Sequence, residues 1–217
     1  MPTEGESQDQ RCLVAFVVPV RNDAIRLARC LASIRATAGP DASIIVMDHG
    51  SVDGSADVAL AAGARVVGAG RDMPNVAALR NQGAGLADTP FVAFIDADHE
   101  VAPTWLASAL AAAGDSHIGA VGAPYHPPQP GTWVQQWYDA LRRHPAAVEP
   151  AEWFGAGNLL VRRDAFTAVG GFDLTLEASE DVDLCHRLAR AGWRLLNVPG
   201  MRCIHHGDPA TLTHLFR

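Results

Sequence analysis

Two carboxylates stand directly after an apolar run near the middle of the chain, in the stretch FVAFIDADHE. Residues 91–95 are all apolar, which predicts a short strand buried on both faces, and Asp96 and Asp98 follow it at once. Ligands of open α/β sheets bind beyond the carboxyl ends of the strands. Two hard oxygen ligands at such a place suit Mg²⁺ or Mn²⁺ carrying a diphosphate. A solvated turn that caps the next helix is the alternative for such a pair in isolation.

Four further polar clusters lie near predicted strand ends or helix starts. A carboxylate at a strand end, such as Asp48, can accept a hydrogen bond from a nucleotide base or cap a turn. A guanidinium such as that of Arg80 can contact phosphate in a bidentate manner or lie on a solvated helix face. The clusters are Pro19-Val20-Arg21-Asn22, Asp48-His49-Gly50-Ser51-Val52-Asp53, Arg80-Asn81-Gln82-Gly83 and Glu180-Asp181-Val182-Asp183-Leu184.

The elements that position these clusters follow from hydrophobic periodicity. In the first half we expect strands over 13–18, 43–47, 64–67 and 91–95, and helices over 23–36, 53–61, 76–86 and 103–113. This alternating order predicts a parallel sheet with right-handed crossovers. In the second half we expect strands over 118–121, 153–161, 193–198 and 201–205, and helices over 133–143 and 180–191.

Length and composition favour one globular domain. The 217 residues are 48% hydrophobic and 19% charged, which is typical of a chain with a substantial core. We expect one domain over 13–217, with a nucleotide-donor half at about 13–123 and an acceptor half at 124–217. The boundary is the proline-rich stretch 124–131, and the polar residues 1–12 are expected to form a flexible leader rather than a signal peptide.

Charge and cysteine content narrow the functional class. The net charge of -7, with no lysine among the 17 basic residues, argues against binding to nucleic acid. No apolar stretch is long enough to span a membrane. The four cysteines form no CxxC pair, so we expect them to be small buried hydrophobes in a reducing cytosol. They are Cys12, Cys30, Cys185 and Cys203.

The five motifs, in this order, resemble the family 2 glycosyltransferases of the GT-A fold, from about Val14 to His206. The resemblance implies a Rossmann-like α/β fold whose mixed, mostly parallel sheet is flanked by helices. It also implies an inverting glycosyltransferase that uses a divalent metal, Mn²⁺ or Mg²⁺. The expected partners are a nucleotide-diphospho-sugar donor and a saccharide or lipid-linked acceptor. The expected location is cytoplasmic, with peripheral contact to the inner face of the membrane through the C-terminal tail as an option.

The resemblance places the donor nucleotide against the first two motifs. The base is expected near Pro19, Arg21 and Asp48, and the diphosphate near Arg80. The chain departs from the family at His49, where many relatives carry Asp or Asn, so the identity of the base stays open.

The resemblance also implies a set of metal ligands. Asp98 is expected to bind the metal directly, and Asp96 to contact the ribose hydroxyls or a metal-bound water. A further ligand is expected from the late His205-His206 pair, with no preference between the two, and adjacent surface histidines are the alternative.

The acceptor side of the resemblance centres on a helix start. Asp181 is the expected general base, since inverting transfer needs a carboxylate opposite the leaving group. Acids at a helix N-terminus also stabilise the helix dipole, which is the structural alternative, and Asp183 is expected to be structural. The residues expected to line the pocket for the sugar and the acceptor are Trp153, Gly155, Gly157, Asn158 and Glu180.

Other classes fit the sequence less well. A dinucleotide-dependent oxidoreductase needs a glycine fingerprint where Pro19-Val20-Arg21-Asn22 stands. A nucleotidyltransferase would carry a glycine-rich loop with lysine there, and the chain has no lysine. A non-catalytic nucleotide-sugar binding module remains the alternative from another class, because a fold alone does not establish catalysis.

Overall fold

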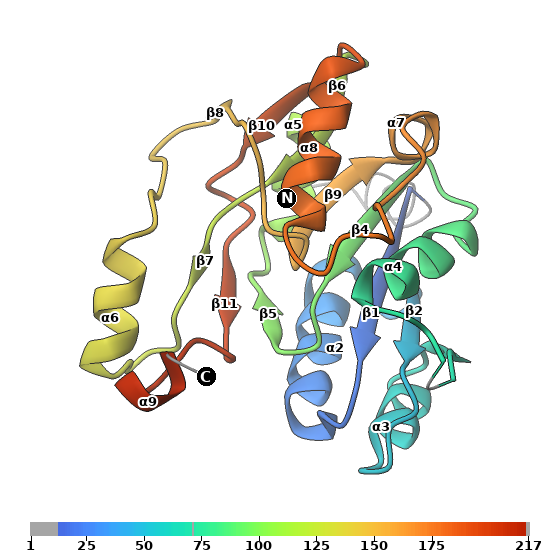
Figure 1. The fold of residues 1–217 in the computed structure, drawn as a ribbon, viewed down its shortest axis with the longest axis vertical. Coiled ribbons are helices and arrows are strands. Elements are labelled where there is room, and N and C mark those ends of the chain that lie inside the picture. Colours follow the sequence, from blue (N-terminus) through green and yellow to red (C-terminus); the bar gives the residue numbers. More distant parts are fainter. Residues whose placement is uncertain (1–12, 71, 216–217) are drawn as a thin grey trace.

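The computed structural model describes residues 13–70 and 72–215, and its main element is an eight-stranded mixed sheet (Figure 1). The strand order is β3-β2-β1-β4-β9-β6-β10-β8, in which β9 and β8 run antiparallel to their neighbours and the rest share one direction. The mixed, mostly parallel sheet is therefore confirmed. Its strands are β1 (Val14–Val20), β2 (Ser43–Asp48), β3 (Arg65–Gly68), β4 (Phe91–Ile95), β6 (Ile118–Gly122), β8 (Glu149–Pro150), β9 (Asn158–Arg162) and β10 (Arg194–Asn197).

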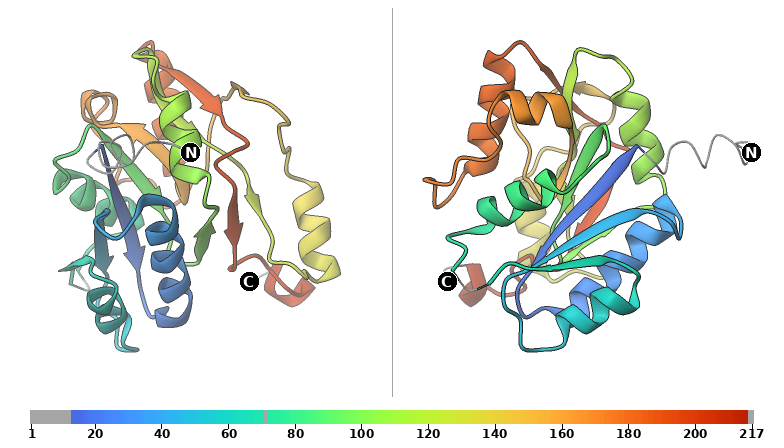
Figure 2. Two further views of the ribbon diagram at one scale, coloured as in Figure 1. Left: turned by 180° about the vertical axis from the view of Figure 1, so that it is seen from behind. Right: turned by 90° about the vertical axis from the view of Figure 1, so that its right-hand side faces the viewer.

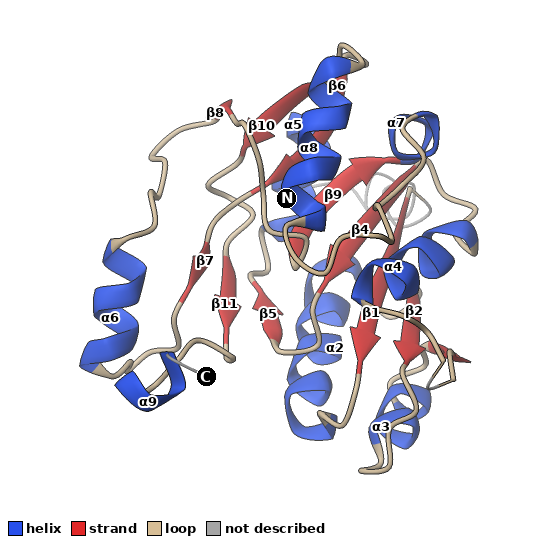
Figure 3. Ribbon diagram, viewed as in Figure 1, coloured by secondary structure: helices blue, strands red, loops and turns tan. Residues whose placement is uncertain are grey.

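Helices cover both faces of this sheet, as the views from the front and from behind show (Figures 1 and 2). One face carries α2, α3 and α5, the other carries α4, α7 and α8, and α6 and α9 lie apart from both (Figure 3). The helices are α2 (Ala24–Ala38), α3 (Ser55–Ala61), α4 (Val76–Gly85), α5 (Trp105–Ala112), α6 (Trp133–Ala140), α7 (Arg163–Ala168), α8 (Glu180–Arg190) and α9 (Leu212–Leu215).

The alternation of side chains along β1 builds two hydrophobic cores. Phe16 lies in the core beneath α2 and α5, where it meets Leu31 and packs at 5.8 Å between ring centroids on Trp105. Its neighbour Val17 faces the other core, which includes Leu184 of α8. Because successive strand residues point to opposite faces, one apolar strand serves both layers.

The chain changes sides of the sheet next to β1, and this creates the crevice where the polar motifs meet. β2 and β3 lie on one side of β1, while β4 pairs with its other side in parallel register. Ligands of open α/β sheets bind at such a switch point, outside the carboxyl ends of the strands. Pro19 near the end of β1 and Asp96 after β4 therefore lie at one edge.

A small three-stranded sheet lies beside the main one and was not expected from the sequence. Its strands are β5 (His99–Val101), β11 (Cys203–His205) and β7 (Tyr125–His126), with β11 in the middle, antiparallel to β5 and parallel to β7. Strands of two or three residues are too short to show an alternating pattern, which explains why β5 and β7 were missed. β5 directly follows β4, whereas β7 follows β6 within the proline-rich stretch 124–131, and the predicted division of the chain at this stretch stays a prediction.

The strand predicted over 153–161 is shorter in the structure. β9 begins at Asn158, and the residues before it form a loop. A Cβ atom at Gly155 would clash with the hydroxyl of Tyr125, and one at Gly157 would lie 2.9 Å from Cε1 of His99. The two glycines therefore let the loop pass close to other side chains, which is what interrupts the strand.

Three of the four cysteines lie in the described part of the chain, and all three are free thiols. Cys30, Cys185 and Cys203 are buried, as predicted, whereas Cys12 and the predicted leader 1–12 lie outside the described residues. Within the described ranges, we find no helix with the length and apolar content required to cross a bilayer.

Candidate active site

A cavity of about 410 Å³ opens at the carboxyl ends of β1 and β4. Its walls come from the loop after β1, the start of α4 and the turn after β4, so residues far apart in sequence converge there. Five of the predicted donor residues line it, namely Pro19, Arg21, Arg80, Asp96 and Asp98.

Asp48 is close to this cavity but does not line it. It ends β2, is 8% exposed, and accepts a hydrogen bond of 3.1 Å from the backbone N–H of Ser51. Its neighbour His49 lines the cavity instead, and the Nε2 atom of His49 is buried without a hydrogen-bond partner. The predicted contact of Asp48 with the base stays a prediction.

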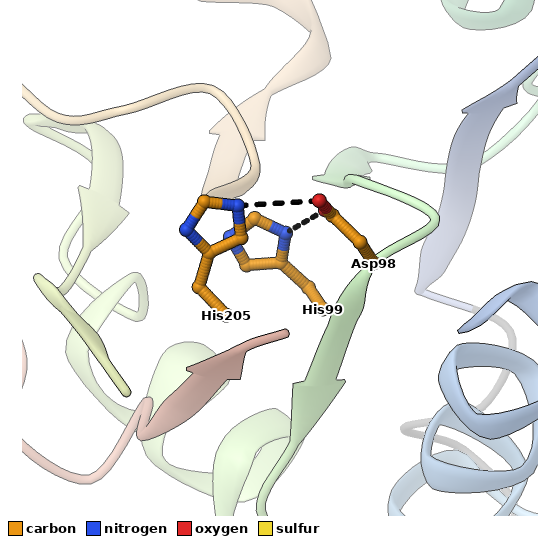
Figure 4. Close-up of side chains that lie close together, drawn as sticks. All are labelled: Asp98, His99 and His205. Carbon is orange, nitrogen blue, oxygen red and sulfur yellow. Dashed lines mark hydrogen bonds and ion pairs between the residues drawn. The ribbon is translucent and has the colours of Figure 1, made fainter. Parts of the chain in front are cut away.

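Asp98 faces the two stacked rings of His99 and His205 from one side, at the edge of the cavity (Figure 4). Its Oδ1 is 3.0 Å from Nδ1 of His99, and its Oδ2 is 3.2 Å from Nε2 of His205. The backbone explains the arrangement, because His99 and His205 are paired residues of antiparallel β5 and β11, and their rings stack at 4.6 Å. The atoms that these three side chains offer to a cation all lie within 4.8 Å of one another.

The electrostatics of this cluster favour a charged carboxylate. Burial alone would raise the pKa of Asp98, but hydrogen bonds from His205 and His99 outweigh it and hold that pKa well below its usual range. Burial alone would lower the pKa of His205, but its hydrogen bonds to Asp208 and Asp98 raise that pKa to about 9. A carboxylate with two imidazoles offers one oxygen and two nitrogen atoms, a donor set that fits a divalent cation.

The structure distinguishes the two adjacent late histidines. His205 turns its Nε2 toward Asp98, whereas His206 places its Nε2 2.9 Å from Glu100 at the surface. Of the two predicted metal ligands, only His205 joins the cluster. The ligand role of His206 has no geometric support in the described structure, because His206 lies in the turn after β11 and its ring contacts Glu100 instead.

Charged side chains on the far side of His205 hold its ring in place. Its Nδ1 is 2.7 Å from Oδ1 of Asp208, and Arg142 donates two hydrogen bonds of 2.6 Å to the carboxylate of Asp208. Asp208 is 4% exposed, and its pKa falls to about 2 because the hydrogen bonds from Arg142 and His205 outweigh burial. A carboxylate on the far nitrogen of a ligand histidine fixes the orientation of the ring.

Arg80 links Asp96 to the start of α8. One of its terminal nitrogens is 2.7 Å from Oδ1 of Asp96 and the other is 2.8 Å from Oε1 of Glu180, while its side chain is only 5% exposed. Burial would raise the pKa of Asp96, but Arg80 and His99 outweigh it and lower that pKa. Both terminal nitrogens of Arg80 are engaged, so its contact with a diphosphate stays a prediction. Asp96 lies outside the cluster formed with His205.

Asp181 and Asp183 differ in what their carboxylates contact. Asp181, in the first turn of α8, accepts a 3.2 Å hydrogen bond from the backbone N–H of Ala156 in the glycine-containing loop. Asp183 forms an i,i+4 ion pair of 2.7 Å with Arg187 along the outside of the helix. The predicted structural role of Asp183 agrees with this pair, while Asp181 faces the loop that carries Gly155 and Gly157.

Two of the residues predicted for the sugar and acceptor pocket line a cavity, and a third is buried. Trp153 and Gly155 line a separate cavity of about 590 Å³, which also includes Tyr125. Asn158 is not available to a ligand, because it is fully buried and its amide bonds the indole of Trp105 and two backbone carbonyls. The expectation for Asn158 is therefore corrected to a structural role, in which one amide satisfies three buried groups.

Tyr125 lies between the histidine cluster and the 590 Å³ cavity. Its ring packs at 4.6 Å on His99 and at 5.5 Å on His205, and its hydroxyl reaches Gly155. Burial and the nearby charges of Asp96 and Asp181 raise its pKa above the usual range. Tyr125 thus forms a wall shared by the histidine cluster and the 590 Å³ cavity.

Sequence reasoning missed several of these residues. His99 directly follows Asp98, and Asp208 lies three residues after His205, so local spacing was a usable signal for both. Arg142 and Tyr125 had no such signal, because only the fold brings α6 and β7 to this place.

Comparison with known proteins agrees with this architecture. Residues 15–174 match the family described as Glycosyl transferase family 2. The chain is 33% identical over 203 residues to the pre-mycofactocin glycosyltransferase of Mycobacterium tuberculosis, covering 86% of this chain and 41% of the relative. It is 40% identical over 97 residues to the N-acetylglucosaminyl-diphospho-decaprenol L-rhamnosyltransferase of the same organism, covering 42% of this chain and 29% of the relative. This chain spans less than half the length of either relative.

Solved structures show the same fold at low sequence identity. A mannosyltransferase from Pyrobaculum calidifontis in complex with GDP-Man and Mn²⁺ has a TM-score of 0.74 at 23% identity, over 94% of this chain and 59% of that one. GalNAc-T7 with UDP, GalNAc and Mn²⁺ has a TM-score of 0.69 at 18% identity, over 94% of this chain and 47% of that one. The sequence matches show that the chain belongs to glycosyl transferase family 2, and the solved structures show that it has the GT-A fold.

Proposed function

We propose that this glycosyltransferase moves a sugar, with inversion, from a nucleotide diphosphate sugar to an acceptor hydroxyl, and that it uses a divalent metal. The observation that carries the proposal is the cluster of Asp98, His99 and His205 at the mouth of the 410 Å³ cavity. The two structural neighbours described above were solved with Mn²⁺ and a nucleotide or nucleotide sugar, which supports the same assignment.

The metal would be held by Asp98 and His205, with His99 as the third ligand of the cluster. Asp98 is charged and the ring of His205 is oriented by Asp208, so both side chains are in position before a donor arrives. His205 would release the proton on Nε2 when the metal binds, because only the neutral imidazole ligates metal. A divalent ion at this position supplies Lewis-acid stabilisation of the charge that grows on the leaving diphosphate. The donor nucleotide would lie along Pro19 and Arg21, with its base near the turn that follows β2.

Asp181 is our candidate for the general base. It lies in the first turn of α8 and is fixed against the backbone of Ala156, next to Gly155, which lines the larger cavity with Trp153. A carboxylate beside the acceptor site can take the proton of the attacking hydroxyl. Arg80 would support this arrangement by tying Glu180, the neighbour of Asp181, to Asp96.

The acceptor would bind in the 590 Å³ cavity. Its walls combine Trp153, Tyr125 and Leu141 with Arg142 and Arg143, so it offers apolar faces beside polar groups. Two relatives are named for acceptors of different kinds, a decaprenyl-linked saccharide and pre-mycofactocin, and we infer a saccharide or lipid-linked acceptor. A cytoplasmic location and membrane contact through the tail remain predictions.

Calorimetry with nucleoside diphosphates tests the donor and metal assignments together. UDP, GDP and dTDP are titrated into the chain in Mn²⁺ and in EDTA, and one of them should bind markedly more tightly in Mn²⁺. Asp98→Asn should abolish that difference, because the substitution removes the charged ligand. Asp115→Asn is the matched control, since Asp115 is exposed and pairs with His117 and Arg194 elsewhere. Equal affinity in Mn²⁺ and EDTA for the parent chain would refute the metal assignment.

An assay of sugar transfer distinguishes an enzyme from a non-catalytic binding module. Release of nucleoside diphosphate from a panel of nucleotide sugars, with water or an added saccharide as acceptor, should be detectable and should require Mn²⁺ or Mg²⁺. Tight donor binding without any release across the panel, with or without acceptor, would favour the binding module.

A further inference from the structure

A second cluster of metal-ligand side chains lies outside the site described above. It consists of His126 on β7, Asp139 on α6 and His144 just after α6, and it is called the α6 cluster below. The atoms that these side chains offer to a cation lie within 4.8 Å of one another. The residues belong to the region with the small sheet and have no role in the proposed transfer.

We propose that the α6 cluster is a binding site for a zinc-type divalent ion, separate from the Asp98 cluster and ligated by His126, Asp139 and His144. Two imidazole nitrogens and one carboxylate oxygen are a donor set that suits Zn²⁺. The Asp98 cluster has the same donor set, but Asp98 lines a cavity where diphosphate oxygens would complete the shell of Mn²⁺ or Mg²⁺, whereas His126, Asp139 and His144 lie outside that cavity. Three protein ligands leave the fourth tetrahedral position for water.

The distances suit a tetrahedral ion. Ligands bound at about 2.0–2.1 Å to such an ion lie roughly 3.3 Å apart. Nε2 of His144 is 2.9 Å from Oδ1 of Asp139, so a small opening of this pair would admit the ion. The rings of His126 and His144 stack at 4.3 Å between centroids with an interplanar angle of 15°, which places the two imidazoles side by side next to the same carboxylate.

The surrounding charges permit a cation. Arg142 comes within 3.8 Å of Asp139, but its guanidinium is already neutralised by two hydrogen bonds to the carboxylate of Asp208. Asp139 and His144 are partly exposed, at 25% and 29% of the side chain, which leaves an entry path.

An ion at this place would close a proline-rich loop. Residues 127–131, PPQPG, lie between His126 and the start of α6, and the ligands would tie β7 to the C-terminal end of α6 across this segment. Binding to the folded chain alone stabilises it by mass action. At a free Zn²⁺ concentration of about 100 times Kd, a chain of this size should gain roughly 5–10 °C in Tm.

The test counts ions on the full chain with Zn²⁺ and with Co²⁺ as a spectroscopic probe. Equilibrium dialysis gives the stoichiometry, and visible absorption of Co²⁺ reports tetrahedral coordination. The variants are the double change His126→Gln with His144→Gln, the single change His144→Gln and the control His117→Gln. His117 also faces an aspartate, Asp115 at 3.0 Å, but belongs to no described cluster of three metal-ligand side chains. Each variant is made in the Asp98→Asn chain, which removes the other candidate ion.

We expect the double variant to lose one ion per chain and the tetrahedral Co²⁺ band, while His117→Gln retains both. Asp98→Asn should keep the tetrahedral band, and His144→Gln should weaken Zn²⁺ binding at least tenfold. The same stoichiometry and spectrum in the Asp98→Asn chain and in the double variant made from it would overturn the proposal, as would loss of the tetrahedral band in Asp98→Asn. Because His144 is partly exposed, its single variant keeps the test valid if the double variant folds poorly. Unchanged Zn²⁺ affinity in that single variant would also overturn the proposal.

Discussion

The main sheet and the small sheet contribute to the site in different ways. The main sheet presents Pro19, Arg80, Asp96 and Asp181 through long strands and helices whose positions are fixed by two hydrophobic cores. The small sheet presents His99 and His205 on strands of three residues, and Arg142 and Asp208 hold His205 through charged hydrogen bonds. The first region is therefore positioned by packing together with the buried ion pairs of Arg80, and the second by side-chain ion pairs around His205.

This difference separates two functions that one enzyme needs. Residues on the main sheet form the donor cavity and the candidate base, while residues of the small sheet complete the candidate metal cluster. Changes in one region should therefore alter one property and spare the other. The four predictions below use that separation, from the largest expected effect to the smallest.

The largest effect should come from the candidate base. Asp181→Asn keeps the shape of the side chain but removes the proton acceptor, so turnover should fall by about 10²–10⁴-fold. Affinity for Mn²⁺ and for the nucleoside diphosphate should stay within about twofold, because the metal cluster is supplied by the other region. Steady-state turnover and calorimetry measure the two properties. Asp183→Asn, whose carboxylate pairs with Arg187, is the control, and a larger loss there would move the base to another residue.

The next largest effect should be a loss of stability when the buried guanidinium of Arg80 is replaced. Arg80→Met leaves Asp96 and Glu180 without their shared partner, which should lower the free energy of unfolding by about 3–5 kcal/mol. Urea unfolding measures this change. Arg143→Met removes an exposed pair with Glu149 and should cost at most about 1 kcal/mol. Equal losses in the two variants would show that Arg80 does not anchor the main-sheet region.

A smaller effect, on metal affinity, should come from the support of His205. Asp208→Asn weakens the hydrogen bond that orients the ring, so affinity for Mn²⁺ should fall by about 10–100-fold. Turnover at saturating Mn²⁺ should recover to near the parent value, because the base is untouched. Glu100→Gln, which alters only the contact with His206, should leave Mn²⁺ affinity unchanged. Unaltered Mn²⁺ affinity in Asp208→Asn would contradict the proposed support.

The smallest effect is expected on the outer face of α6. Trp137 is 48% exposed, so Trp137→Ala should change the free energy of unfolding by no more than about 0.5 kcal/mol. Thermal or urea unfolding checks this expectation. A loss of several kcal/mol would mean that α6 packs as tightly as the helices on the main sheet, and the contrast between the two regions would fail.

The main-sheet region could be predicted from the sequence alone, because its strands and helices show clear local patterns. Apolar runs such as residues 43–47 and 91–95 are strands at nearly the predicted bounds, and helical spacing located α2, α4 and α8. Motifs at the ends of those elements identified Asp96, Asp98 and Arg80 as neighbours, because parallel strands bring their carboxyl ends to one edge. The family resemblance supplied the candidate roles.

The small sheet and the residues that meet around it were decided only by the tertiary structure. Strands β5 and β7 are too short for a periodic signal, and their pairing with β11 is what places His99 beside His205. The choice of His205 over His206 depends on where β11 ends, because His205 is its last residue and His206 begins the turn after it. The burial of Asn158 depends on Trp105 from another element. Arg142 and Asp208 are 66 residues apart, and a contact of that range follows from packing rather than from local sequence.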